Sequence, residues 1–220
     1  MNKILLILLL FCSFTLFSQD ENDEGFEAFA YNPKSKFGIR LGLGRSNFVT
    51  QNFLNPTALI GYTAGFYHHM RLADKHNFYY ELGARFSGSN FNTSPDSITY
   101  SRVSLFYLEL PVCYMFNISN NDYKPIFIML GGGGRLLIKS SMLLGPDPIP
   151  KYFNLPLKRG DLFLMGGIHS FFGGMGLQLT AKIGLTDINK REWRGFETVK
   201  PSLDRNLPVR NFAIEMALIF

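Results

Sequence analysis

Cysteine is nearly absent from this chain of 220 residues, which contains only Cys12 and Cys113. Cys12 lies in an apolar amino-terminal stretch that we expect to be removed, so one cysteine remains and an internal disulfide is excluded. Long apolar runs are missing as well. Beyond that stretch, no segment approaches the roughly 18 consecutive apolar residues that a membrane-spanning helix requires. The stability of the mature chain must therefore come from neither disulfides nor a helical anchor.

Motifs that carry chemistry are also scarce. His68 and His69 are adjacent, so in a strand they point to opposite faces and cannot chelate one metal ion; a structural or interfacial role is the better interpretation. Residues 131–135 lack the Gly-Lys-Ser/Thr ending of a phosphate-binding loop and favour close packing within a strand. The serines and His169 show no spacing of a nucleophile with its base. We therefore predict no enzyme activity, no cofactor and no metal site.

The amino-terminus has the features of a secretory signal. Lys3 precedes an uncharged run of 14 residues, 4–17, and the small residue Ser18 comes before Gln19. Such a run is too short to span a bilayer as a helix, which needs about 20 residues. The pattern predicts a signal peptide over 1–18. A lipoprotein signal modified at Cys12 is the less favoured alternative, because Phe11 stands where a small residue is expected.

The charge is distributed unevenly along the mature chain. Residues 19–35 hold five acidic side chains and one basic one without periodicity, and we interpret them as an acidic, mobile periplasmic segment. Subtracting Lys3, Lys34 and those five acids from the totals of 22 basic and 17 acidic residues leaves 20 and 12 for the domain 36–220. Because a secreted protein does not meet nucleic acid, this positive charge indicates surface electrostatics among anionic lipid head groups.

The last ten residues alternate strictly between large apolar side chains and other side chains. Period-two alternation is typical of a strand that separates two environments. An apolar row that ends on a terminal aromatic residue is typical of the closing strand of an outer-membrane β-barrel, and we predict that this row is needed for insertion. It consists of Phe212, Ile214, Met216, Leu218 and Phe220.

Alternation elsewhere predicts eight strands of the length that a tilted strand needs to cross a bilayer, about 9 to 11 residues. Connections after odd-numbered strands are long and those after even-numbered strands are short, which is typical of an outer-membrane barrel with external loops and both termini in the periplasm. We predict an all-β fold, an eight-stranded antiparallel transmembrane β-barrel. Its expected strands are 37–44, 59–70, 78–87, 103–116, 126–138, 161–171, 177–185 and 210–220.

Charged side chains decide which face of this barrel points inward. A lipocalin-like barrel would turn its apolar face inward, but an Arg or Lys facing lipid at mid-membrane costs about 2 to 4 kcal/mol. We expect the charged face to line the lumen as one paired network, with glycines on the same face leaving room for long side chains. The network should consist of Arg40, Glu81, Arg85, Glu109, Arg135, Lys182 and Glu215.

Two local features refine the expected barrel. Pro111 lacks a backbone donor, which predicts a β-bulge in the fourth strand. Phe37, Phe78, Phe116 and Phe220 should all lie near the periplasmic rim, where they would form part of an aromatic girdle.

The connection 186–209 combines basic and aromatic side chains. This composition favours contact with a protein or a surface polysaccharide, whereas a solvated loop is the simpler alternative. The candidate contact residues are Lys190, Arg191, Trp193, Arg194 and Phe196.

Four segments carry a resemblance to a known family: the signal end Ser18-Gln19, residues 107–112 (Tyr-Leu-Glu-Leu-Pro-Val), residues 181–188 (Ala-Lys-Ile-Gly-Leu-Thr-Asp-Ile) and the closing strand. Over 36–220 the chain resembles the PorT-like, or "porin family", outer-membrane barrels of the Bacteroidetes. The resemblance implies the barrel fold, a cell outer membrane location and insertion by barrel-assembly machinery. PorT itself is associated with type IX secretion, but its distinctive amino-terminal region is not evident here.

These observations favour a non-enzymatic structural or binding component of the cell envelope. Its lumen should be plugged by side chains, since eight strands leave an interior that side chains fill. A pore for small solutes or ions, and an accessory role in type IX secretion, are the alternatives. The expected partners are outer-membrane lipid, the barrel-assembly machinery and an envelope protein.

Overall fold

The computed structural model describes residues 35–49, 56–92, 100–119, 124–144, 151–153, 157–172, 175–188 and 209–220. The predicted signal peptide and acidic segment lie outside these residues, except for Ser35. Within these ranges, no helix is both long and apolar enough to cross a membrane.

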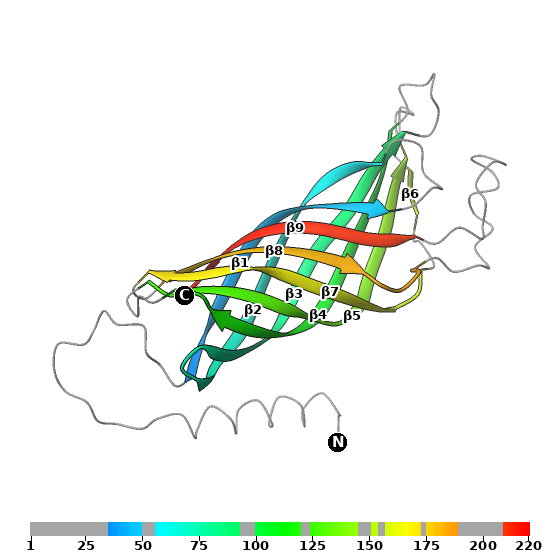
Figure 1. Ribbon diagram of the computed structural model, residues 1–220. Helices are drawn as coiled ribbons and strands as arrows, with labels where there is room; N and C mark the ends of the chain where they lie inside the picture. Colours follow the sequence, from blue (N-terminus) through cyan, green and yellow to red (C-terminus); the bar gives the residue numbers. More distant parts are fainter. Residues whose placement is uncertain are drawn as a thin grey trace.

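The described residues form a closed antiparallel barrel of eight long strands with one short additional strand (Figure 1). Pairing runs in the order β4-β3-β2-β1-β9-β8-β7-β5, and a further pairing of β4 with β5 closes the ring, while β6 pairs only with the end of β5. The predicted fold class is therefore confirmed. The strands are β1 (Ser35–Val49), β2 (Thr57–Ala73), β3 (His76–Asn92), β4 (Tyr100–Asn117), β5 (Ile126–Leu144), β6 (Lys151–Phe153), β7 (Gly160–Phe172), β8 (Met175–Gly184) and β9 (Arg210–Ile219).

Most strands run beyond their predicted ends. β5 continues to Leu144 instead of ending at Ile138, and β6 lies inside a connection that we expected to contain no strand. Only Asp74 and Lys75 separate β2 from β3. The predicted lengths followed from bilayer thickness, whereas ladder pairing depends on backbone groups and continues past the apolar belt.

The bulge predicted at Pro111 is wrong. Pro111 pairs with Gly133 of β5 in continuous register, and the register shift of that ladder lies between Phe106 and Tyr107. The missing donor affects the other side instead, because the β3–β4 ladder is interrupted around Pro111 and then resumes without an inserted residue. The proline therefore removes pairing locally and leaves the strand alignment unchanged.

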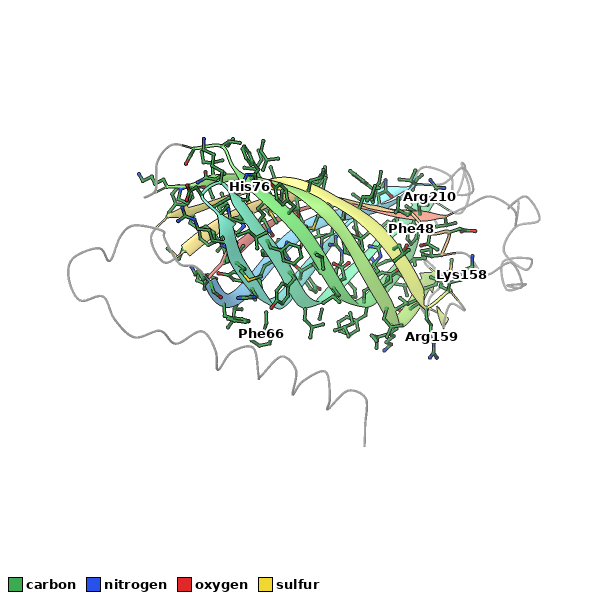
Figure 2. All side chains as sticks on the ribbon, turned by 60° about the horizontal axis from the view of Figure 1, so that its bottom comes forward. Phe48, Phe66, His76, Lys158, Arg159 and Arg210 are labelled. Carbon is green, nitrogen blue, oxygen red and sulfur yellow. The ribbon has the colours of Figure 1, made fainter. Side chains whose placement is uncertain are left out.

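Side chains alternate between the lumen and the outer surface as the charge pattern predicted. In β1, Leu43 is 61 % exposed and Arg40 is 1 % exposed. In β9, the apolar row from Ile214 to Phe220 points outward, with Phe212 half-buried. Phe66, which projects from the wall in Figure 2, is 67 % exposed. The apolar face is therefore the outer face, and the lipocalin-like alternative is excluded.

The two ends of the barrel differ in their connections. The end that carries the β2–β3 turn is called here the short-turn end, and the opposite end the long-loop end. The carboxy-terminus lies at the short-turn end (Figure 1). All four phenylalanines of the expected girdle lie there too: Phe37 faces His68, Phe78 faces Met70, Phe116 faces His76, and Phe220 bonds to Ile39.

Phe220 takes part directly in closing the ring. Its amide donates to the Ile39 carbonyl at 2.9 Å, and its carbonyl accepts from the Ile39 amide at 3.1 Å. The terminal residue thus extends the β1–β9 ladder at the short-turn end.

We expect the folded barrel to resist sodium dodecyl sulfate in the cold and to migrate differently on a gel before and after boiling. A closed ring has no free edge from which unfolding can start, and its ladder hydrogen bonds are all internal. Electrophoresis of refolded protein measures this. Identical migration of boiled and unboiled samples would contradict closure.

Deleting Phe220, or replacing it with Asp, should lower the membrane-inserted yield. The deletion removes two closing hydrogen bonds, and the substitution places a charge on the lipid-facing row. Phe220→Leu is the matched control, since it keeps the backbone and an apolar side chain. The yield is measured as the heat-modifiable fraction after assembly in cells, and normal assembly of both test variants would refute the predicted role.

Candidate functional site

The lumen contains three layers of inward-facing side chains. Toward the long-loop end lies an apolar cluster formed by Phe48, Val103, Leu105, Tyr107, Leu137, Met142, Ile188 and Val209. Toward the short-turn end lies a second cluster, formed by Tyr67, Tyr79, Cys113, Met115, Phe127, Met129, Phe163, Met165, Phe171 and Ile219. The predicted charges form the third layer, between the two clusters: Glu109 lies between Tyr107 and Cys113 along β4, and Arg135 lies between Met129 and Leu137 along β5.

Glu215 on β9 is the most connected carboxylate of the lumen. It lies 2.8 Å from Nη2 of Arg40, 2.6 Å from Nη1 of Arg85 and 3.6 Å from Nζ of Lys182. The hydroxyl of Thr63 donates a further hydrogen bond to its Oε1 atom. One carboxylate therefore joins cations from β1, β3 and β8.

Glu109 on β4 shares two of those cations. Its Oε2 atom accepts from Nζ of Lys182 at 2.7 Å, and its Oε1 atom lies 3.7 Å from Nε of Arg85. Arg135 approaches the same Oε1 atom at 3.6 Å. Because Lys182 and Arg85 serve both carboxylates, the loss of either carboxylate affects the partners of the other.

The network continues to both sides of this centre. Arg40 lies 3.5 Å from Glu81, whose other oxygen accepts from the Tyr79 hydroxyl at 2.7 Å. On the far side, Nε and Nη2 of Arg135 both donate to Asp161, the former at 2.7 Å. All seven predicted residues are thus joined in one connected network, and the side chains of its ion pairs are at most 4 % exposed.

Asp161 is the member of the network that the sequence prediction missed. It adds a fourth carboxylate to the four cations, so the buried network is formally neutral. The missing signal has a clear cause. Inward Phe163 and outward Leu162 and Leu164 make both faces of β7 apolar, so alternation does not reveal which face carries Asp161.

Neutral side chains satisfy donors that the carboxylates leave over. Arg40 donates from Nε to Gln178 at 2.6 Å and from Nη1 to Thr63 at 2.8 Å. The guanidinium of Arg135 lies over the rings of Tyr107 and Phe163, at 4.9 and 5.5 Å from their centroids. Buried cations are stabilised when their donors have partners. These neutral residues supply such partners, and a prediction based on charged residues alone does not include them.

Glycines on the inner face make room for the charged side chains, as predicted. A Cβ atom at Gly83 would lie 2.7 Å from Oε1 of Glu81, and one at Gly42 would lie 3.0 Å from Oε1 of Glu215. A Cβ atom at Gly184 would lie 3.0 Å from Nη2 of Arg135. These contacts are too short to be accommodated without shifting the network.

The adjacent histidines point to opposite faces. His69 lies in the lumen against the rings of Phe127 and Phe171. His68 stacks outside on Phe37 and hydrogen bonds through Nδ1 to the Tyr80 hydroxyl at 2.7 Å. Among the described residues, no group of three or more His, Cys, Asp or Glu side chains is placed to hold a metal ion.

The predicted surface-contact residues, Lys190, Arg191, Trp193, Arg194 and Phe196, lie outside the described residues.

Comparison with known proteins identifies a fold and no family. No family model matches the chain, and no curated protein matches it. The crystal structure of Neisserial surface protein A (NspA) is 10 % identical, with a TM-score of 0.50 over 84 % of this chain and 97 % of that chain. Ail, the attachment invasion locus protein of Yersinia pestis, is 12 % identical, with a TM-score of 0.39 over 85 % and 99 %. At these identities the likeness concerns the fold alone, which is an outer-membrane β-barrel of eight strands.

Replacing Glu109 with Ala should lower the free energy of unfolding by about 3 to 5 kcal/mol, because it leaves Arg135 and Lys182 short of a carboxylate in a buried site. Urea titration of the barrel in vesicles measures the effect. Glu109→Gln is the matched control for lost volume, and Leu130→Ala is the control for truncation on the exposed outer face. Equal stability of the Ala and wild-type proteins would show that water reaches the site and compensates the charges.

Proposed function

We propose that the protein is a structural or binding component of the cell envelope, located in the outer membrane, with a lumen closed by its own side chains. The observation that carries this proposal is the neutral network of four cations and four carboxylates, all nearly fully buried in the barrel. Its members bind one another, so they present neither a free charge to attract a solute nor an activated nucleophile to attack one.

The arrangement of the lumen argues against the alternative of a pore. An ion entering from the long-loop end would first meet the apolar cluster around Leu105 and Ile188, both fully buried. It would then have to break one of two close ion pairs. Nζ of Lys182 lies 2.7 Å from Oε2 of Glu109, and Nη1 of Arg85 lies 2.6 Å from Oε2 of Glu215. Breaking a dry ion pair leaves an uncompensated buried charge, which is strongly unfavourable.

The proposed orientation places the short-turn end, and with it both termini of the barrel, in the periplasm. Short turns on that side and long loops outside are general features of outer-membrane barrels. The apolar terminal row would be recognised by barrel-assembly machinery during insertion. The resemblance to PorT-like barrels supports a source in the Bacteroidetes, and an accessory role in type IX secretion would show as a loss of secreted proteins on deletion of the gene.

Purified wild-type protein in a planar bilayer should show no steady open state, because the lumen holds both an apolar layer and a neutralised charged layer. Conductance is measured after heat-modifiable migration has confirmed that the inserted sample is folded. The variant Ile188→Gly, which thins only the apolar layer, should remain closed as well. A large constitutive conductance of the wild type would refute the plugged lumen and make transport the better proposal.

A further inference from the structure

The outer surface of the barrel is hollowed across β1 to β4, and the hollow continues over β9 and β8 through Met216, Leu218 and Leu177. A cavity of about 710 Å³ opens on this surface. Its floor includes Ala64 and Ala84, which face each other across the β2–β3 ladder. Two methyl side chains among larger neighbours leave the space open. This feature is called the β1–β4 hollow below.

Aromatic side chains border the β1–β4 hollow on the side of the long-loop end. Tyr62 pairs with Phe86, and Phe86 pairs with Phe106, so the three lie in one row across β2, β3 and β4. The rings of Tyr62 and Phe86 are stacked, with centroids 5.3 Å apart. This row provides a rigid apolar edge beside the alanine floor.

Exposed cations lie just beyond the aromatic row. Lys139 of β5 is directly opposite Phe106, and Arg45 of β1 is two residues beyond Leu43, the partner of Tyr62. Arg102 lies four residues beyond Phe106 on the same outward face of β4 and is also exposed. All of them are at the long-loop end, where Figure 2 labels the further cations Lys158, Arg159 and Arg210.

Carboxylates are confined to other places in the described part of the chain. Four of them belong to the lumen network, and Asp74 lies in the turn at the short-turn end. Asp187 accepts a hydrogen bond from the backbone amide of Val209. The outward faces of the described strands therefore carry Arg and Lys at the long-loop end with no Asp or Glu beside them.

Apolar space and positive charge are separated by the distance expected for an amphiphile. Arg45 pairs with Ile60, which is four residues from Ala64 along β2. The backbone of Arg45 therefore lies about 13 Å along the strands from the floor of the hollow. Across the barrel wall, four strand spacings place Arg45 on β1 and Lys139 on β5 about 19 Å apart. Arg45 lies on the long-loop side of the middle of the hollow, and Lys139 lies just beyond its β4 end. The same face of a second copy would bring the same cations, and its described strands carry no outward Asp or Glu there, which disfavours pairing of two copies through this face.

We propose that the β1–β4 hollow and its adjoining cations bind a phosphorylated lipid of the leaflet at the long-loop end. One acyl chain occupies the hollow, and a phosphate oxygen of the lipid accepts hydrogen bonds from Arg45. Lys139 and Arg102 lie too far away to reach the same phosphate, and they attract the negatively charged head groups alongside it. This inference rests on the proposed location in the outer membrane and adds a ligand class to it. Each cation near a charged membrane surface attracts anionic lipid by about 1 kcal/mol, which corresponds to roughly fivefold in affinity.

The test uses the full barrel reconstituted in vesicles of phosphatidylcholine with spin-labelled phosphatidic acid or spin-labelled phosphatidylcholine of identical acyl chains. The motionally restricted fraction of each probe gives the relative association constant. Wild-type protein should prefer phosphatidic acid at least fivefold. The double variant Arg45→Gln/Lys139→Gln should reduce that preference to below twofold while keeping heat-modifiable migration.

Two further variants separate the site from general surface charge. Lys158→Gln/Arg159→Gln removes the same charge beside β7 and should keep the preference. Ala64→Leu/Ala84→Leu fills the hollow and should lower the restricted fraction of both probes, and Ala84→Leu alone serves if the double variant inserts poorly. The proposal would be overturned if both charge-removing variants lowered the preference equally, or if the wild type showed no preference for phosphatidic acid. It would also be overturned if the alanine-to-leucine variants left the restricted fraction unchanged. Crosslinked dimers that the alanine variants abolish would instead assign the hollow to an interface between copies.

The outcomes for this inference and for the proposed function are distinguishable. A folded, non-conducting barrel without lipid preference overturns the lipid site only. A conducting barrel that keeps its lipid preference overturns the plugged lumen only. Failure of wild-type protein to insert into vesicles would contradict the membrane location on which both depend.

Discussion

Closing eight strands into a ring satisfies the backbone of each strand, but it also forces every second side chain into an interior no wider than those side chains. Any charge on the inner face must then find its partner inside the barrel, because neither lipid nor bulk water can supply one. Four cations and four carboxylates meet this requirement together. Glycines on the inner face leave space for the long charged side chains, and neutral polar side chains contribute further hydrogen bonds. The apolar clusters fill the lumen on either side of the charges.

Sharing distinguishes this network from a set of separate pairs. Arg85 and Lys182 each contact both Glu215 and Glu109, and Arg135 contacts both Glu109 and Asp161. The positive charge of one guanidinium therefore offsets parts of two carboxylates. Such an arrangement is rigid, since neither Glu109 nor Glu215 can rotate away without weakening contacts to more than one other strand. It gives a physical reason to regard the barrel as a fixed wall in the membrane.

The sequence was sufficient for the fold and for most of the lumen, for reasons that the structure makes plain. In the middle of β1, β3 and β9 alternation places Arg40, Glu81, Arg85 and Glu215 on one face only. A narrow barrel brings such charges together whichever strands they come from. The sequence did not predict Asp161, because both faces of its strand are apolar. It did not predict the roles of Thr63 and Gln178 either, because neutral polar side chains show no pattern that marks a lumen contact. The effect of Pro111 depended on its neighbours across the ladder, which local sequence does not reveal. The short strand β6 forms by pairing with a distant segment.

The position of Glu215 has a consequence for how the last strand meets the first. Its partners Arg40 and Arg85 belong to β1 and β3, so these contacts exist only after β9 has joined β1 in the observed alignment. A slip of one residue at this seam would turn Glu215 toward lipid. A slip of two residues would keep it inside but move it by about 7 Å, beyond reach of a guanidinium now 2.6 Å away. The buried charges thus favour the correct register between β9 and β1, because in any other register Glu215 is a buried or lipid-facing carboxylate without a cationic partner.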